Sequence, residues 1–409
     1  MAQIKYLFIL LSLSLTSLSW SQDCVDKNLV KAKNSPFNII PAYNQDGTGT
    51  CYAFAASQLA NYYLIKEKNY KKLSVHPLWA ALTYSEASHD KTIKSGLTDG
   101  ALRELSKSQI CDYSLISKSL QKFTKENTLS DHEVMAFIET YGNSYQKEIE
   151  VYLSRARKLE DENKNYKYKV AIDNTYVHKI YKVHRSPADK AIEYSKIYAL
   201  NEAKKNVAQF AVCGETDLNQ FAMSITPLLK TLDIKTFKDL IFPECFSKLK
   251  ASQLPTPESF SDLKASDENF AKNLRSHFTT SNQPLGIHYC SGVLNNPELD
   301  YIDEAPGNPK KSPGRHSTNM LPGCGPHASI LVGSRPTKNS CEFLLRNTWG
   351  GDYGAWTKNW SCDCKNKKTG EYLKNCKAKT HPVSKYEVVG CWVPEKKLSK
   401  NLYGTQWLK

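Results

Sequence analysis

Cys51 stands where the local sequence could activate a thiol. A glycine-rich turn over residues 44–50 leads into it, and Ala53, Ala55 and Leu59 then follow at helical spacing. A thiol in the first turn of a helix lies at the positive end of the helix dipole, which favours the thiolate. The sequence therefore predicts a nucleophilic cysteine that opens a helix.

A nucleophilic thiolate needs a cationic partner that can also carry its proton, and an imidazole held by a third group does both. Among ten histidines, His327 follows a glycine–proline turn and enters an apolar run, residues 328–333, typical of a buried strand. A second strand, residues 343–346, ends at Asn347. If these strands are antiparallel neighbours, Asn347 lies beside His327 and holds its tautomer, and Trp349 shields their hydrogen bond from water.

These segments together resemble the papain-like (cathepsin) cysteine peptidase family. Gln45 stands six residues before Cys51, and the chain order of glutamine, cysteine, histidine and asparagine is the order in that family. The resemblance implies that Cys51 attacks a peptide carbonyl while His327 and Asn347 serve the proton transfer. It also implies that Gln45 and the Cys51 backbone N–H stabilise the oxyanion, with no cofactor and no metal. The matching motifs are Gly49-Thr50-Cys51-Tyr52-Ala53-Phe54, His327-Ala328 with Val332-Gly333, and Asn347-Thr348-Trp349-Gly350 with Tyr353-Gly354.

The resemblance extends to a substrate-binding segment. Residues 96–100 resemble the glycine-rich turn of the family, although Asp99 stands where a second glycine is usual. Asp99, Gly100 and Trp349 are therefore expected to bind substrate. The similarity covers about half of the chain and implies an α+β, two-lobed papain-like fold: a helical lobe and an antiparallel β lobe, with a mostly helical insertion.

The start of the chain predicts export. Lys5 precedes an apolar run over residues 6–15, and Ser19 and Ser21 offer small side chains where a signal peptidase reads. The run is too short to span a bilayer comfortably, so no membrane span is expected after the signal is removed. We therefore expect a secreted or periplasmic protein.

The spacing of the motifs predicts the domain boundaries. His327 lies 276 residues after Cys51, which leaves room for a large insertion. A capping box at residues 130–133 and helical periodicity after it predict that the insertion is mostly helical. Pro255 and Pro257 predict a linker over residues 249–265 that leads back to the core. These helices either cover the site in place of a propeptide or only support the first lobe. The expected division is a signal peptide at 1–21, a first lobe at 22–111, the insertion at 112–275 and a β lobe at 276–409.

Export changes how the 12 cysteines are interpreted, because oxidising compartments favour disulfides. Cys362, Cys364, Cys376 and Cys391 could form a zinc site, yet their spacing matches no common zinc knuckle, and disulfides are expected instead. With Cys51 reserved for chemistry, eleven cysteines remain. At least one of them must stay unpaired or pair between chains.

The net charge of +14 comes mainly from the C-terminal third, above all from a lysine-rich loop at Lys365–Lys379. This loop could contact an anionic surface or could simply be solvated. No groove-reading motif accompanies it, so no nucleic acid is expected. With 409 residues, 40% of them hydrophobic, the chain is neither a small hormone nor a disordered polymer.

The sequence thus predicts an exported papain-like cysteine endopeptidase that acts on proteins or peptides. Two alternatives stay open. One is a catalytically silent or capped scaffold that acts as a binding or adhesion module. The other is an enzyme that uses the same Cys51 chemistry to transfer an acyl group to an amine instead of water.

Overall fold

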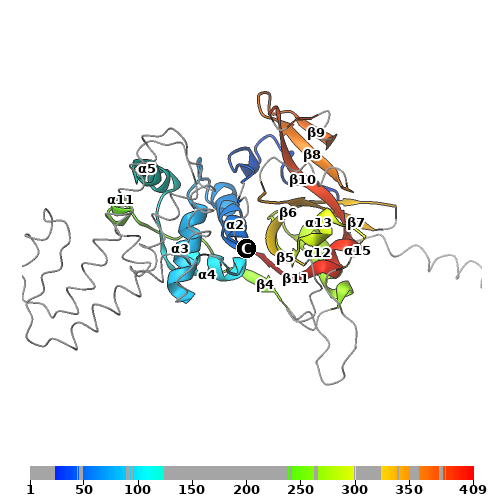
Figure 1. The fold of residues 1–409 in the computed structure, drawn as a ribbon, viewed down its shortest axis with the longest axis horizontal. Helices are drawn as coiled ribbons and strands as arrows, with labels where there is room; N and C mark the ends of the chain where they lie inside the picture. The colour runs from blue at the N-terminus through cyan, green and yellow to red at the C-terminus, as the bar shows by residue number, and fades with distance from the viewer. Residues whose placement is uncertain are drawn as a thin grey trace, which may run out of the picture.

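The described part of the chain forms two regions, one made mainly of helices and one built on a sheet (Figure 1). The computed structural model describes residues 24–43, 45, 49–88, 93, 95–123, 238, 242–261, 266–298, 300, 324–338, 340–349, 359–376, 381–382 and 384–409. The expected signal peptide, most of the expected insertion and the Gly350, Tyr353 and Gly354 of the asparagine motif lie outside these residues. The first region contains η1 (Pro36–Asn38), α2 (Cys51–Glu67), α3 (Pro77–Ser88), α4 (Thr98–Lys107), α5 (Tyr113–Phe123) and α11 (Pro243–Phe246).

The second region is an antiparallel sheet. Along its path the strands are β4 (Glu258–Phe260), β11 (Leu402–Trp407), β5 (Leu285–Cys290), β6 (Pro326–Pro336), β7 (Cys341–Arg346), β10 (Tyr386–Pro394), β8 (Ser361–Asn366) and β9 (Tyr372–Cys376). The short β1 (Lys27–Asn28) also pairs with β6. Three helices accompany the sheet: α12 (Asp267–Thr280), α13 (Gly292–Asn295) and α15 (Glu395–Asn401). The expected α+β class is therefore confirmed.

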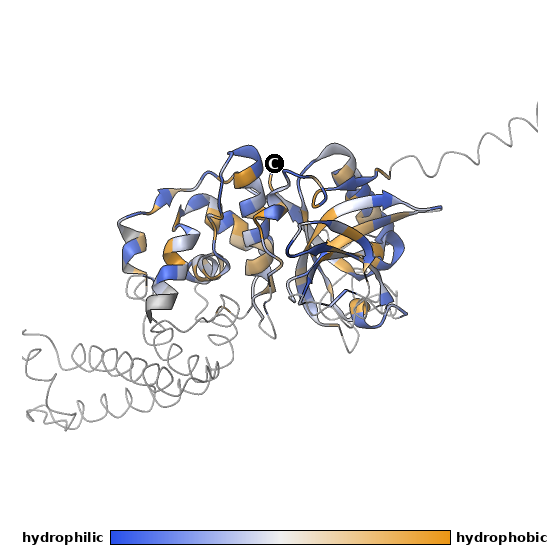
Figure 2. Cartoon of the chain, turned by 90° about the horizontal axis from the view of Figure 1, so that it is seen from above, coloured by the Kyte–Doolittle hydropathy of each residue, from blue (hydrophilic) through white to orange (hydrophobic). Residues whose placement is uncertain are grey.

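The central strand β6 is buried because helices cover both faces of the sheet around it. Ala328, Ile330 and Val332 belong to the core that contains α2, whereas Leu331 belongs to the core that contains Phe278 of α12. Successive side chains of a strand point to opposite faces, so this alternation packs α2 and α12 against opposite sides of β6. Figure 2 shows both hydrophobic and hydrophilic residues in the strands of the sheet.

Residues 109–111, directly before the expected insertion, meet residues 245–251, which lie within it, beside α3. Strand β2 (Gln109–Ile110) pairs with β3 (Lys250–Ala251), and a disulfide joins Cys111 to Cys245. The expected boundary at residue 275 lies inside α12. The segment 249–265, whose prolines suggest a linker, contains β3 and β4. The helices expected within the insertion beyond α5 lie outside the described residues.

The cysteines form the disulfides that export predicts. The pairs are Cys24–Cys341, Cys111–Cys245, Cys290–Cys324, Cys362–Cys391 and Cys364–Cys376. The four cysteines weighed as zinc ligands thus belong to two disulfides. Cys213, the remaining cysteine besides Cys51, lies outside the described residues. Such a set of disulfides is consistent with an exported, extracellular protein.

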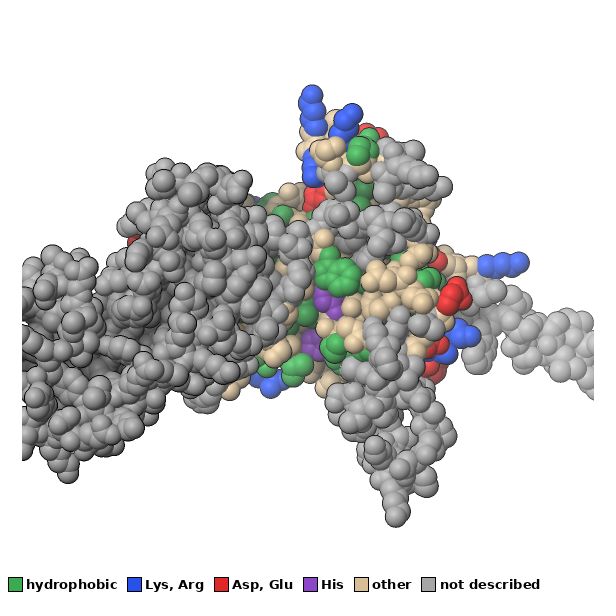
Figure 3. All heavy atoms as spheres, viewed as in Figure 1, with side chains coloured by type: hydrophobic (Ala, Val, Ile, Leu, Met, Phe, Trp, Pro, Cys, Tyr) green, Lys and Arg blue, Asp and Glu red, His purple; other side chains and the backbone are tan. Residues whose placement is uncertain are grey.

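The lysine-rich loop belongs to the β8–β9 hairpin at one edge of the sheet. Lys367, Lys368 and Lys374 are exposed there, and Lys and Arg side chains gather over this hairpin in Figure 3. Lys377 and Lys379 lie outside the described residues. Within the described part of the chain, none of the helices combines the length and the apolar character needed to cross a bilayer.

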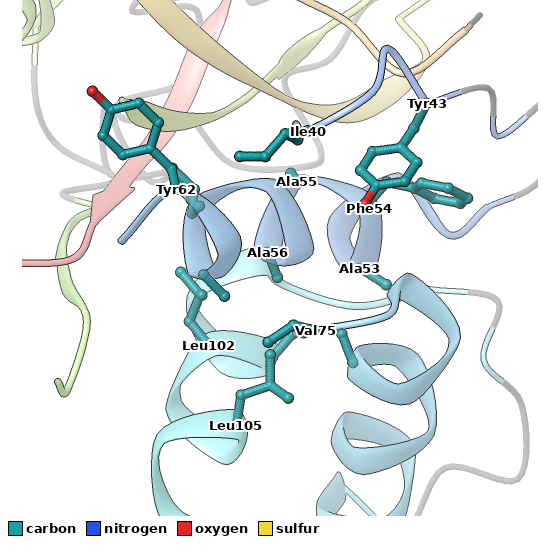
Figure 4. Close-up of a cluster of buried hydrophobic side chains, with 14 of the residues drawn as sticks. Ile40, Tyr43, Ala53, Phe54, Ala55, Ala56, Tyr62, Val75, Leu102 and Leu105 are labelled. Atoms are coloured by element: carbon teal, nitrogen blue, oxygen red, sulfur yellow. The ribbon is translucent and has the colours of Figure 1, made fainter. Parts of the chain in front are cut away.

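Helix α2 is the central helix of the first region, and it places Cys51. Its residues from Tyr52 to Leu64 are buried, because the helix is covered on all sides. Ala53 and Ala56 lie near Val75 and the side chains of α4, while Ile40 and Tyr43 lie on the opposite side of the helix (Figure 4). The alanines allow neighbouring segments to approach closely, and close packing resists movement. The N-terminus of α2 is thereby held in a fixed position.

Candidate active site

Cys51 lies at the edge of the core rather than within it. It is the first residue of α2 and is partly exposed, while the residues after it are buried. The carbonyl of Thr50 accepts hydrogen bonds from the N–H groups of Ala53 (2.9 Å) and Phe54 (3.3 Å), which closes the first helical turn. Cys51 belongs to no disulfide in the described chain. The geometry therefore keeps a thiol at a helix N-terminus within reach of solvent.

His327 and Asn347 meet where β6 begins and β7 ends. These strands are antiparallel neighbours, as the sequence predicts. The Nε2 atom of His327 lies 2.6 Å from Oδ1 of Asn347, and both side chains are buried. Because the amide oxygen accepts, Nε2 carries the proton of the neutral imidazole, and Nδ1 is the basic nitrogen.

Two further donors fix the Asn347 amide. Its Oδ1 accepts a hydrogen bond from Ser329 Oγ at 2.9 Å and another from the Thr348 backbone N–H at 2.7 Å. Ser329 in turn lies 3.1 Å from the hydroxyl of Tyr289. Since three donors converge on this oxygen, a flipped amide would place its NH₂ group against them. The orientation that holds His327 is therefore strongly favoured.

Aromatic rings enclose the imidazole of His327. The Trp349 ring lies 4.9 Å from it and the Tyr289 ring 5.7 Å from it, between centroids. Burial lowers the pKa of His327 to about 4, the hydrogen bond with Asn347 acts in the opposite direction, and the charge of His288 lowers the pKa further. At neutral pH the imidazole is then a base that can accept a proton.

Gln45 is tied to the residue that follows Asn347. Its backbone N–H donates to the Thr348 carbonyl at 2.6 Å, and its Oε1 accepts a hydrogen bond from the Thr348 hydroxyl. The side chain is buried. Because the amide oxygen faces Thr348, the Nε2 donor end points away from it. Three of the predicted catalytic residues, Gln45, His327 and Asn347, therefore belong to one hydrogen-bonded group.

The pKa of Tyr403 responds to both Cys51 and His327. Tyr403 lies on β11, at the bulge where the pairing with β5 shifts between Leu402 and Gly404. Burial raises the pKa of its phenol, the negative charge of Cys51 raises it further, and a hydrogen bond from the His327 backbone lowers it. The phenol of Tyr403 is therefore influenced by the charge of Cys51 and by the His327 backbone.

The expected substrate-binding residues Asp99 and Gly100 lie in the first turn of α4. Asp99 pairs with Arg103 at 3.6 Å, and a Cβ atom at Gly100 would come within 2.6 Å of the Tyr84 ring. The absence of a side chain at Gly100 therefore serves close packing of α4 against α3. Within the described part of the chain, no hydrogen bond or ion pair joins Asp99 or Gly100 to the hydrogen-bonded group directly.

The start of α4 is instead linked to the sheet by a second buried histidine. Nε2 of His288 accepts a hydrogen bond from the Thr98 N–H at 3.2 Å, and its ring lies 5.8 Å from that of Tyr403. Burial lowers the pKa of His288 to about 4, and the charge of Asp99 acts against this. Histidine and hydrophobic side chains lie together in the middle of the face in Figure 3.

Sequence reasoning missed four residues of this region: Ser329, His288, Tyr403 and the buried Arg346. Ser329 lies two residues after His327 on the same strand, so strand periodicity could have indicated it. His288 and Tyr403 come from β5 and β11, and no local pattern marks them. Only the strand order brings them to the site.

No group of histidines, cysteines or carboxylates suited to a metal ion occurs among the described residues. Comparison with protein-family models finds no match to this chain, and comparison with curated proteins finds none either.

Proposed function

We propose that this protein is an exported cysteine endopeptidase with a papain-like Cys–His–Asn site. One observation carries the proposal: a buried His327 donates through Nε2 to Asn347, and a partly exposed Cys51 opens helix α2. The charge of Cys51 and the His327 backbone both act on the phenol of Tyr403. This is the arrangement that makes a thiol nucleophilic and supplies it with a proton carrier.

The proposed reaction begins with transfer of the Cys51 thiol proton to Nδ1 of His327. The thiolate sulfur then forms a bond to the carbonyl carbon of the substrate, and the carbonyl electron pair moves to oxygen. The Nε2 donor of Gln45 and the Cys51 backbone N–H stabilise this oxyanion. Asn347 keeps the imidazole in the tautomer that leaves Nδ1 basic.

The tetrahedral intermediate collapses when Nδ1 of His327 gives its proton to the leaving amine nitrogen. The C–N bond breaks, and the acyl group stays on the Cys51 sulfur. A water molecule then attacks the thioester while His327 removes its proton, and the acid product leaves with the thiol restored. No redox change and no cofactor enters this sequence.

The two-lobed arrangement of the fold is part of the same proposal. We propose that the helical region around α2 and the antiparallel sheet are two lobes of a papain-like fold, with the reactive groups where they meet. The support is the position of the residues: Cys51 comes from the helices, whereas His327 and Asn347 come from the sheet. Peptides or proteins are the substrate class, because the sequence motifs resemble those of a peptidase family.

The test uses the purified protein with a mixed library of fluorogenic peptides, and the Cys51→Ala variant beside it. We expect turnover by the wild type and none above background in the variant. An epoxide that alkylates activated thiols should label Cys51, as found by peptide mass spectrometry, and should abolish turnover. A second variant, His327→Ala, should also lose turnover. His381→Ala is its matched histidine control, because His381 packs on Tyr386 away from the site.

A wild type that cleaves no peptide and whose Cys51 resists the epoxide would refute the proposal. The silent scaffold then becomes the better explanation. Its exposed lysines at the β8–β9 hairpin predict binding to anionic vesicles, which substitution of Lys367 and Lys368 by glutamine would weaken. Product analysis with a competing amine separates hydrolysis from acyl transfer.

A further inference from the structure

A buried arginine stands directly before Asn347. Arg346, the last residue of β7, is 1% exposed, and its guanidinium reaches three other segments. Its Nε donates to Oε1 of Gln58 at 3.1 Å, its Nη2 to the Ile40 carbonyl at 3.1 Å, and its Nη1 to the Val389 carbonyl at 3.4 Å. A buried charge is tolerated only when acceptors surround it. These acceptors come from α2, the N-terminal segment and β10.

Glu387 completes the arrangement around Arg346. Its Oε1 lies 3.8 Å from Nη2 of Arg346, and the same oxygen accepts a hydrogen bond from the Ala42 backbone N–H at 2.7 Å. The guanidinium therefore holds the backbone at Ile40, and the carboxylate holds it two residues later. The chain continues from there to Gln45, whose N–H donates to Thr348.

The N-terminal segment depends on these contacts more than α2 does. Residues 41–43 form neither helix nor strand, so their position is set by a few hydrogen bonds and by the packing of Tyr43. Helix α2 is packed on all sides, and the loss of one bond at Gln58 should leave it in place. Segments with few buried contacts shift first when a bond is lost.

We propose that Arg346 and Glu387 are positioning residues that act through Gln45. They fix residues 40–42, and hence the Gln45 amide, relative to the strand end that carries Asn347. The inference rests on the proposed peptidase function, because Gln45 matters here as the donor to the oxyanion. Lysine cannot replace Arg346, since its single ammonium cannot reach acceptors on three segments at once.

The experiment separates the oxyanion step from activation of the thiol. Peptide turnover forms an oxyanion, whereas alkylation of Cys51 by iodoacetamide forms none. The variants are Arg346→Lys, Glu387→Ala, Gln45→Ala and the double variant Arg346→Lys with Gln45→Ala. For Arg346→Lys we expect kcat to fall about 10- to 100-fold, with KM and the alkylation rate within about threefold of wild type. In the Gln45→Ala background the same change should lower kcat less than about threefold further, because both act on one group.

Arg335→Lys is the matched control. Arg335 also pairs with a glutamate, Glu342, at 2.6 Å, but it lies at the other end of β6. It should leave kcat unchanged. Thermal melts show whether each variant is folded. If Arg346→Lys does not fold, Glu387→Ala takes its place, because Glu387 is 30% exposed, and a fall in kcat of about three- to tenfold is expected.

Three results would overturn the inference. They are an unchanged kcat in the folded variants, an equal loss of alkylation and turnover, and full additivity with Gln45→Ala. A wild type that turns over no peptide overturns the proposed function and this inference with it. An active wild type that Arg346→Lys or Glu387→Ala leaves unaltered overturns this inference alone.

Discussion

Two buried polar networks lie on the same sheet, and they differ in where they end. The first joins His327, Asn347, Ser329 and Thr348, and we propose that it serves the partly exposed Cys51. The second surrounds Asp363 on β8, which is 1% exposed.

In the second network, the hydrogen bonds of the buried carboxylate are all made to other groups of the described chain. The carboxylate of Asp363 accepts hydrogen bonds from the Tyr372 hydroxyl at 2.6 Å, the Trp392 indole at 2.9 Å and the Asn375 backbone N–H at 3.2 Å. Burial, and after it the charge of Asp363, raises the pKa of the Tyr372 phenol. Both networks therefore contain buried side chains whose pKa values are shifted. What distinguishes the candidate site is that it contains a buried imidazole and a partly exposed thiol, the proposed base and the proposed nucleophile.

The largest expected difference between the networks is in turnover. His327→Ala removes the proton carrier, so kcat/KM should fall by about 10³- to 10⁴-fold while the melting temperature changes little. Peptide kinetics and a thermal melt check this. A fall in kcat/KM of less than about tenfold would place the base elsewhere.

Asp363→Ala should give the opposite result. It leaves the Tyr372 and Trp392 donors buried without their acceptor, which should lower the free energy of unfolding by about 3 kcal/mol. The kcat/KM of the folded protein should stay within about twofold of wild type. Urea unfolding with activity measured below the transition tests both points, and a large loss of kcat/KM in folded protein would show that the networks are coupled.

Acid should weaken the fold and the activity in different ranges. Burial lowers the pKa of His277, His288 and His327 to about 4 from an ordinary value of 6.5. The unfolded chain therefore binds these protons first, and stability present above pH 6.5 is lost as the pH falls towards 4, by at most about 3 kcal/mol for each histidine. Melting temperatures from pH 7 to 4 should decline accordingly.

His277→Gln sharpens this prediction, because His277 donates to the Gln283 carbonyl outside the site. The variant should flatten the acid decline of the melting temperature. The fall of kcat/KM in acid follows protonation of His327. The variant should therefore not move this fall from near pH 4. A fall near pH 6.5 would contradict the buried neutral imidazole.

The smallest effect is expected at Ser329. Ser329→Ala removes one of the donors to Asn347 Oδ1, but the Thr348 N–H remains, so kcat should fall only about fivefold. Ser334→Ala is the control on the same strand, since its hydroxyl donates to the Val25 carbonyl away from the site. Equal activities of the two variants would show that the Ser329 bond does not orient Asn347.

Local signals in the sequence predicted some features well. The helix that opens at Cys51, the strands that bear His327 and end at Asn347, and the disulfides all follow from periodicity, turn residues and cysteine count. The linker expected over 249–265 is less accurate. Ser266 caps α12 and two acids follow it, which is a helix start signal, whereas Pro255 and Pro257 favoured a linker. Prolines are compatible with the edge strand β4, which begins directly after them.

The sequence by itself determined which residue types were available and the local structure around them, because capping, dipole and periodicity effects act over a few neighbouring residues. The tertiary structure alone decided which partners meet. Gln45 and Thr348 are 303 residues apart, and Cys111 and Cys245 are 134 apart. No local rule selects such pairs. The strand order and the packing of α2 against β6 bring them together, and they also bury Arg346 beside the residues it holds.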